Sequence, residues 1–266
     1  MTTDLRITYT NFAQHLYAFD GLKMSPMVEG PFPGPDVPIT TEPDIPWTRF
    51  DNVCQAQGRI GMCETAASTN LLEILVRFHV DPGFFAPDFQ IDPLPIYRYV
   101  RARKYPNDPN GSGLRPGDTF SLLHELGLAP ASARIEWIPP TARDIVDALA
   151  TSPLIQGTCV DKEWNNVNPA TGEIPDGDAV VNGHATCIVG GRLRYGHFWP
   201  VWDNTWKYSD GTPWGFHGRG TRSWDCHRYH LLCKPYRIRY DYAEFLNSQA
   251  FLKALEPYIV RGGDQP

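Results

Sequence analysis

The stretch QGRIGMCETAASTNLLEILVRF, residues 57–78, joins a glycine-rich turn and a cysteine to a long apolar repeat. From position 63 onward the apolar residues recur at the spacing of one helix face, at Ala67, Leu71, Ile74, Leu75 and Phe78. The repeat ends at the breaker sequence DPG, residues 81–83. These residues predict a helix that begins at Cys63 directly after a turn.

A cysteine in the first turn of a helix is a candidate nucleophile, because free backbone N–H groups and the positive end of the helix dipole stabilise a thiolate. Gly58 and Gly61 permit a tight backbone approach before Cys63, and the amide of Gln57 can turn toward the sulfur. With the backbone N–H of Cys63, that amide would form an oxyanion hole. The alternative is an apolar core cysteine after an ordinary polar turn.

Two later motifs supply partners for such a nucleophile. The first, NGHATCIVGG (182–191), places His184 at the start of an apolar run. The second, DNTW (203–206), places Asn204 and Trp206 on one face of a strand, because they alternate with Thr205. The amide of Asn204 could then orient the imidazole of His184, and the indole of Trp206 could keep water off that contact.

Other interpretations of these polar residues remain open. A single histidine at the edge of a strand is often structural, which is the alternative for His184. Asp203 could orient the histidine in place of Asn204, although in a strand it would face away. His197, seven residues before Asn204 in an expected turn, is expected to be exposed.

The rest of the chain divides into a helical and a β-rich part. Helices are expected at 94–104, at 118–127 with Asp118 as N-cap and Gly127 at the end, and at 141–150 with Thr141 in a capping box. Strands are expected in the short apolar runs PLIQGTCV, HATCIVGG, FWPVWDN, HRYHLLC and YRIRY, and the segment 242–260 returns to a helical pattern.

These patterns predict an α+β fold with three parts. Residues 1–46 are rich in proline toward their end and are expected to form an extended arm. Residues 47–135 form a helical lobe around the helix from Cys63. Residues 136–266 form a β-rich lobe whose C-terminal helix packs back across the body.

Composition excludes several classes of function. The chain has 266 residues, 42% of them hydrophobic, which is enough for a substantial core. The net charge of −6 and the pI near 5.7 argue against a nucleic-acid partner. We find neither a long apolar span for membrane insertion nor a secretion signal at the start, so the expected location is cytoplasmic, or outside the cell after release by lysis or in a phage particle.

Cysteine usage predicts reduced thiols and no metal. The six cysteines are too sparse for a disulfide scaffold, and no CxxC pair occurs. The stretch CHRYHLLC (226–233) mixes Cys and His, but in a strand those side chains would be split between two faces. We therefore expect no metal site and no cofactor.

The ordered motifs QGRIGMC, NGHA and DNTW, with the later WGFHGRG (214–220), resemble those of the papain-like cysteine peptidase family. The segments DPLPIYRYVRARK, GSGLRPGDTFSLLHELGLAP and WIPPTARDIVDALATSPLIQGTCV are also similar to its bacterial and archaeal members. The resemblance covers about residues 46–235 and implies a two-lobe fold, in which the helical lobe carries the cysteine and a β-barrel-like lobe carries the histidine and asparagine.

The resemblance also implies a role for each matching residue. Cys63 would be the nucleophile and His184 its general base and acid, with Asn204 orienting His184. Gln57 and the backbone of Cys63 would form the oxyanion hole. The supporting residues would be Trp206, Gly61 and Gly183.

Three positions depart from the family pattern. Ile60 stands where a disulfide-forming cysteine is common, Lys207 replaces a glycine after Trp206, and Glu64 replaces a tryptophan after the nucleophile. A carboxylate at Glu64 suits the helix dipole, but it would oppose a thiolate if it pointed at the sulfur. The sequence leaves the direction of that side chain open.

Three functions fit these observations. The first is a cysteine peptidase acting on a peptide or protein substrate. The second is a cell-wall peptide hydrolase or phage particle component with the same fold, which the absence of a recognisable secretion signal favours. The third is a catalytically idle structural or binding module. Substrate preference and oligomeric state are not specified by the sequence.

Overall fold

Helix α2 (Cys63–His79) runs through the middle of the molecule, as the helical repeat predicts. The computed structural model describes residues 47–50, 60–80, 90–111, 113–177, 180–195, 197–203 and 212–260. Every residue of α2 from Cys63 to Val76 is buried, and Leu71, Ile74 and Leu75 are fully enclosed. Phe78 is the exception among the predicted apolar positions, with 42% of its surface exposed near the end of the helix. Such complete burial requires neighbours on every side of α2.

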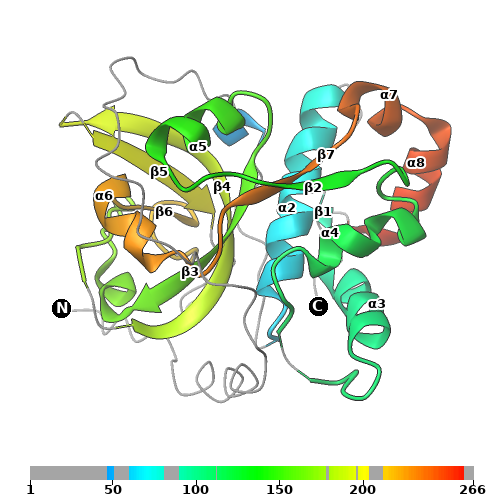
Figure 1. The fold of residues 1–266 in the computed structure, drawn as a ribbon, viewed down its shortest axis with the longest axis horizontal. Helices are drawn as coiled ribbons and strands as arrows, with labels where there is room; N and C mark the ends of the chain where they lie inside the picture. Colours follow the sequence, from blue (N-terminus) through cyan, green and yellow to red (C-terminus); the bar gives the residue numbers. More distant parts are fainter. Residues whose placement is uncertain are drawn as a thin grey trace.

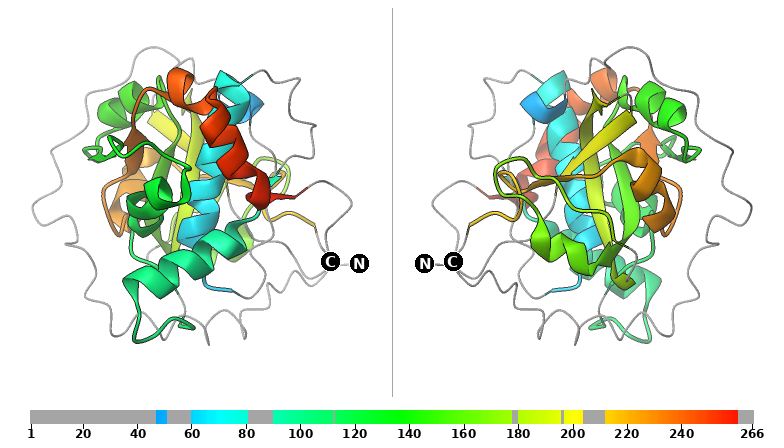
Figure 2. Two further views of the ribbon diagram at one scale, coloured as in Figure 1. Left: turned by 90° about the vertical axis from the view of Figure 1, so that its right-hand side faces the viewer. Right: turned by 90° about the vertical axis from the view of Figure 1, so that its left-hand side faces the viewer.

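Helices cover one side of α2 and a sheet covers the other (Figure 1). The side view in Figure 2 places α3 and α8 in front of α2, with strands behind it. The helices on this side are α3 (Pro93–Lys104), α4 (Asp118–Leu122), η4 (Leu123–Leu126), α7 (Tyr242–Leu246) and α8 (Gln249–Leu255). The side chain of Asp92 caps α3 by accepting a hydrogen bond from Leu94 N at 2.9 Å.

The expectation that Asp118 is the N-cap of its helix was wrong by one residue. Gly117 is the N-cap, with a φ of 85°, and Asp118 is the first helical residue. The Asp118 carboxylate instead accepts hydrogen bonds from Arg115 N at 2.9 Å and from the hydroxyl of Tyr105 at 2.6 Å. Gly127 ends the 3₁₀ turn that follows with a φ of 70°, as expected.

A six-stranded antiparallel sheet with the order β2-β7-β3-β4-β5-β6 covers the other side of α2. Its strands are β2 (Arg134–Trp137), β3 (Leu154–Asp161), β4 (Val180–Arg194), β5 (His197–Asp203), β6 (Arg219–Thr221) and β7 (Tyr236–Arg239). The expected boundary between 135 and 136 falls inside β2, which pairs with β7. In Figure 1 these two strands extend from the sheet toward the helices.

The remaining elements complete the two sides. Helix α5 (Ala142–Leu149) begins after Thr141, whose hydroxyl accepts a hydrogen bond from Asp144 N, as the capping box predicts. The C-terminal segment returns to the helical side, where β8 (Ile259–Val260) pairs with β1 (Gln90–Ile91). Short 3₁₀ turns occupy η2 (Trp47–Arg49), η5 (Lys162–Asn166) and η7 (Glu256–Tyr258). The proposed arm, residues 1–46, lies outside the described residues.

The expected strand in HRYHLLC is wrong. Residues 224–230 form α6 (Trp224–His227) and the 3₁₀ turn η6 (Arg228–His230). Trp224 and His227 lie one turn apart and are both buried, and the ring of His227 stacks on Trp202 of β5 with centroids 4.4 Å apart. Packing against the sheet therefore selects a helical conformation here.

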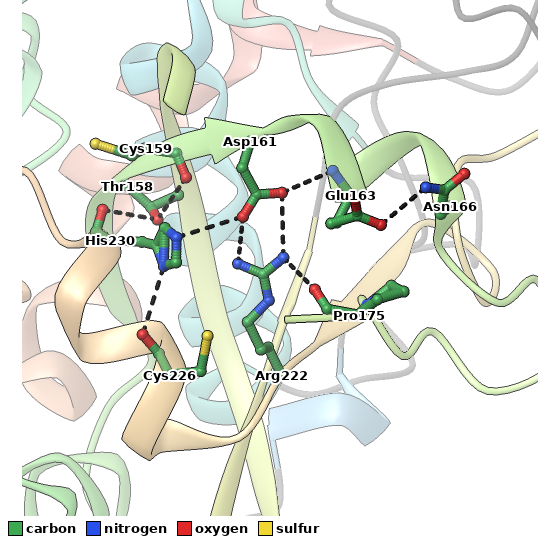
Figure 3. A network of polar contacts seen from close by, with 9 residues as sticks. All are labelled: Thr158, Cys159, Asp161, Glu163, Asn166, Pro175, Arg222, Cys226 and His230. Carbon is green, nitrogen blue, oxygen red and sulfur yellow. Dashed lines mark hydrogen bonds and ion pairs between the residues drawn. The ribbon is translucent and has the colours of Figure 1, made fainter. Parts of the chain in front are cut away.

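A buried ionic network holds this helix against β3 (Figure 3). Arg222 donates to both oxygens of Asp161, at 2.7 and 3.2 Å, and both side chains are at most 1% exposed. Glu163 N donates to the same carboxylate at 2.9 Å, and His230 Nε2 lies 3.4 Å from it. Arg222 also donates to the carbonyl of Pro175. The ion pair is thus almost fully satisfied by hydrogen bonds in a water-excluded site.

Within the described part of the chain, no helix is both long enough and apolar enough to span a membrane.

Replacing Arg222 with Met should lower the free energy of unfolding by about 3 kcal/mol or more, because it leaves the buried charge of Asp161 unpaired. Urea denaturation monitored by tryptophan fluorescence measures this loss. The matched control is Arg143→Met, which breaks the exposed Arg143–Asp147 pair on α5 and should cost less than about 0.5 kcal/mol. Equal losses in the two variants would contradict the assigned role of the network.

Candidate functional site

Cys63 is the first residue of α2, as the sequence predicts. The turn before it is fixed by backbone hydrogen bonds: Gly113 N donates to the carbonyl of Gly61 at 3.0 Å, and Met62 N donates to the carbonyl of Ile60 at 2.8 Å. Gly61 therefore ties the start of α2 to the segment that follows α3. The side chain of Met62, the N-cap residue, does not cap the helix.

The sulfur of Cys63 lies against β4. The neighbouring backbone N–H groups of Ala185, of Glu64 and of Cys63 itself favour the thiolate and lower the pKa of the thiol. Burial of the side chain, which is 9% exposed, outweighs these groups and raises the pKa of the thiol to about 11. The expectation that the helix start lowers the pKa of Cys63 is thus contradicted, because the cost of burying the charge outweighs the effect of the neighbouring backbone N–H groups.

His184 precedes Ala185 in β4, so the strand that contacts the sulfur also carries the candidate base. Its register places it opposite Thr158 of β3, and its side chain is only 3% exposed. Gly183 pairs with Cys159, and a Cβ at this position would lie 2.8 Å from Leu232 Cδ1. A glycine beside His184 thus permits the close packing of β4.

An aromatic cluster that sequence reasoning missed lies beside His184. The ring of Trp164 meets the imidazole edge to face, with centroids 6.2 Å apart. Trp164 in turn stacks on Trp214 at 5.1 Å, and the Trp214 indole N–H donates to the carbonyl of Trp164 at 2.9 Å. Trp214 opens the WGFHGRG motif, so that motif was the available signal, whereas Trp164 stands in a polar run that gave none.

Gln57, Asn204 and Trp206 lie outside the described residues, so their roles stay predictions. The last described residue before Asn204 is Asp203, which ends β5 opposite Cys187. Because Cys187 lies three residues from His184 in β4, Asp203 is on the sheet face opposite to the one that carries His184.

The two rival polar residues have other partners. Asp203 accepts a hydrogen bond from the amide of Asn70 in α2 at 2.6 Å, and Arg219 Nε lies 3.3 Å from its other oxygen. It therefore joins the sheet to the central helix. His197 begins β5 and is exposed, as expected, although in a strand and not in a turn, and its Nδ1 contacts the carboxylate of Asp225.

Glu64 points into the protein interior and is only 2% exposed. Its carboxylate accepts hydrogen bonds from Gly117 N and from the Tyr236 hydroxyl, both at 3.1 Å, and from the Thr119 hydroxyl. Burial raises the pKa of Glu64 to about 7 despite these donors. The open question about its direction is thus answered: it lies between α4 and β7.

Among the described residues, no group of three or more His, Cys, Asp or Glu side chains is arranged to hold a metal ion.

Helix α2 begins with a cysteine and packs against an antiparallel sheet whose strand β4 carries a histidine, which is the arrangement of the papain-like fold. The structure matches solved papain-family cysteine proteases, which confirms that fold. No protein-family model matches the sequence, and no curated protein sequence matches it significantly.

Three of the similar solved structures illustrate the match. Bromelain from Ananas comosus is 13% identical, with a TM-score of 0.56, and the match covers 76% of this chain and all of that one. Xylellain, a cysteine protease from Xylella fastidiosa, is 19% identical, with a TM-score of 0.54 and coverage of 77% and 91%. Digestive procathepsin L2 proteinase from Tenebrio molitor is 17% identical, with a TM-score of 0.55 and coverage of 86% and 79%.

The burial of Glu64 predicts a pH-dependent stability difference between the wild type and Glu64→Gln. The pKa of Glu64 is about 7 in the folded protein against 4.5 for a free side chain, so the folded state holds the proton more tightly. Its contribution to stability is therefore greatest below pH 4.5 and falls as the pH rises through 7. Relative to the wild type, Glu64→Gln should gain about 3 kcal/mol between pH 4.5 and pH 8.

Urea denaturation of both proteins across this range measures the difference. A difference that does not change with pH would show that Glu64 is ionised at its ordinary pKa.

Proposed function

We propose that this chain is a cysteine peptidase that hydrolyses peptide bonds through a thioester acyl-enzyme on Cys63. The observation that carries the proposal is the packing of α2, which begins at Cys63, against β4, which carries His184. The backbone N–H of Ala185, the residue after His184, lowers the pKa of the Cys63 thiol. The papain-like fold supports it, because solved structures of that fold are cysteine proteases. The substrate would be a peptide or protein.

In the proposed reaction, the Cys63 sulfur attacks the carbonyl carbon of the scissile peptide while its proton passes to His184. The negative oxygen of the tetrahedral intermediate would accept hydrogen bonds from the Cys63 backbone N–H and the Gln57 amide. His184 then protonates the departing amine, which leaves a thioester. Water, deprotonated by His184, attacks the thioester and releases a carboxylic acid and the free thiol.

Burial of the sulfur makes His184 essential to this scheme. An isolated thiolate at Cys63 is disfavoured, since burial raises the pKa of the thiol to about 11. Transfer of the proton to His184 places a positive imidazolium close to the new thiolate and keeps the site neutral. Asn204 would orient the imidazole and Trp206 would exclude water, as Trp164 does on its own side of the ring.

Alkylation by iodoacetamide tests the Cys63–His184 pair. In the wild type, ion-pair formation should make Cys63 react at pH 6, where ordinary thiols are protonated. In His184→Ala the sulfur loses its base, and its reactivity should appear only as the pH approaches the thiol pKa of about 11. Peptide mapping by mass spectrometry assigns the label to Cys63, with Cys226 as the internal control, since its pKa is also about 11.

If Cys63 and Cys226 are alkylated at equal rates in the wild type at pH 6, Cys63 is not an activated nucleophile.

Peptidase activity is tested by digestion of a broad peptide library, with Cys63→Ala as the control. The wild type should generate new amino termini, and the variant should lose at least about 10³-fold of the rate because the attacking sulfur is gone. Products formed equally by both proteins would exclude Cys63 as the nucleophile. No products from either protein would favour an idle module.

Comparing Asn204→Ala with Asp203→Asn tests which residue orients His184. Asn204→Ala should lower kcat/KM by about 10²-fold or more, because the imidazole loses its orienting partner. Asp203→Asn keeps the shape of a side chain bonded to Asn70 and Arg219, so kcat/KM should fall by less than about tenfold. The reverse order of effects would assign the orienting role to Asp203.

A further inference from the structure

We propose that Glu64 is a positioning residue for Cys63: its buried carboxylate fixes the first turn of α2, and its charge restrains formation of the thiolate. This inference rests on the proposed role of Cys63 as nucleophile. A carboxylate that is 2% exposed carries a large desolvation cost, which hydrogen bonds must offset. Glu64 therefore needs a structural or chemical explanation beyond its helix propensity.

The contacts of Glu64 join three elements at the start of α2. Gly117 N, from the N-cap of α4, and the Tyr236 hydroxyl, from β7, both donate to one carboxylate oxygen at 3.1 Å. The Thr119 hydroxyl donates to the other oxygen, and the Thr65 hydroxyl lies 3.1 Å from that of Thr119. Since the peptide bond of Glu64 directly follows Cys63, these contacts fix the sulfur relative to both α4 and the sheet.

The groups that face Glu64 are themselves acids. They are Cys63 on its own helix, Asp118 on α4, Tyr236 on β7 and Cys233 shortly before β7. A negative charge on Glu64 raises the pKa of Cys63, and Asp118 raises the pKa of Glu64. Because the pKa of Glu64 is about 7, its opposing charge is present at pH 8 and absent at pH 5.5.

The pH dependence of Cys63 alkylation in Glu64→Gln and the wild type tests this inference. The amide keeps the shape and an acceptor oxygen but removes the charge, so the variant should resemble the wild type at pH 5.5. At pH 8 it should react at least about threefold faster. Glu64→Ala removes the acceptors as well, and it should react more slowly than Glu64→Gln at both pH values.

Glu73→Gln is the matched control. Glu73 is also fully buried in α2 and accepts a hydrogen bond from Ile91 N at 2.6 Å, but it lies about 15 Å along the helix from Cys63. For Glu73→Gln, the Cys63 alkylation rate divided by that of the wild type should not change with pH. If the same ratio for Glu64→Gln is also independent of pH, the inference is overturned.

Tyr236→Phe gives a second, independent reading if Glu64→Gln fails to fold. The Tyr236 hydroxyl lowers the pKa of Glu64, so its removal should move the pH at which the opposing charge appears to a higher value. An unchanged alkylation profile in Tyr236→Phe would count against the inference. The alkylation rate measures the reactivity of the Cys63 sulfur and does not depend on peptide hydrolysis. These outcomes therefore remain interpretable even if the wild type cleaves no peptide and the proposed function fails.

Discussion

The contact between the start of α2 and strand β4 is the constraint on which the rest of the structure depends. Helix α2 and strand β4 pack together although they lie more than one hundred residues apart in the sequence, and the backbone N–H of Ala185 favours a thiolate at Cys63. Two helical turns further along α2, Asn70 donates a hydrogen bond to Asp203, which joins the helix to the neighbouring strand β5. Burial of nearly every face of α2 makes these contacts rigid, because a fully enclosed helix can neither rotate nor slide without breaking its packing.

Burial also decides the electrostatics of the candidate site. The dipole of α2 and its first N–H groups favour a thiolate, yet the loss of water around Cys63 costs more. A buried nucleophile is thus ionised only if its proton stays close by, as it would on His184. The same loss of water acts on Glu64, whose raised pKa reflects burial and not a lack of donors. Two adjacent side chains therefore resist charge for the same reason.

The sequence predicted what depends on local pattern. The periodic apolar residues placed α2, and Pro139, Pro140 and Thr141 placed the start of α5. The strand predicted for HRYHLLC, residues 227–233, was wrong because packing against β5 selects a short helix that ends at His227. The segment is too short for its sequence to distinguish a helical from a strand period. The direction of Glu64 could not be predicted either, since its donors lie 53 to 172 residues further along the chain.

Position 64, directly after Cys63, shows how a residue that differs from the papain-like pattern can be accommodated. A buried carboxylate there is tolerable only where other elements supply donors, and here α4 and β7 both do. The left-handed conformation of Gly117, with a φ of 85°, is part of this solution, because it belongs to the turn that presents its N–H to Glu64. Glu64, Gly117, Thr119 and Tyr236 therefore act as one unit. The N–H of Gly117 also donates to the Tyr236 hydroxyl at 3.0 Å, so an apolar side chain at position 64 would chiefly remove the acceptor of that buried hydroxyl. Glu64 and its distant partners therefore depend on one another.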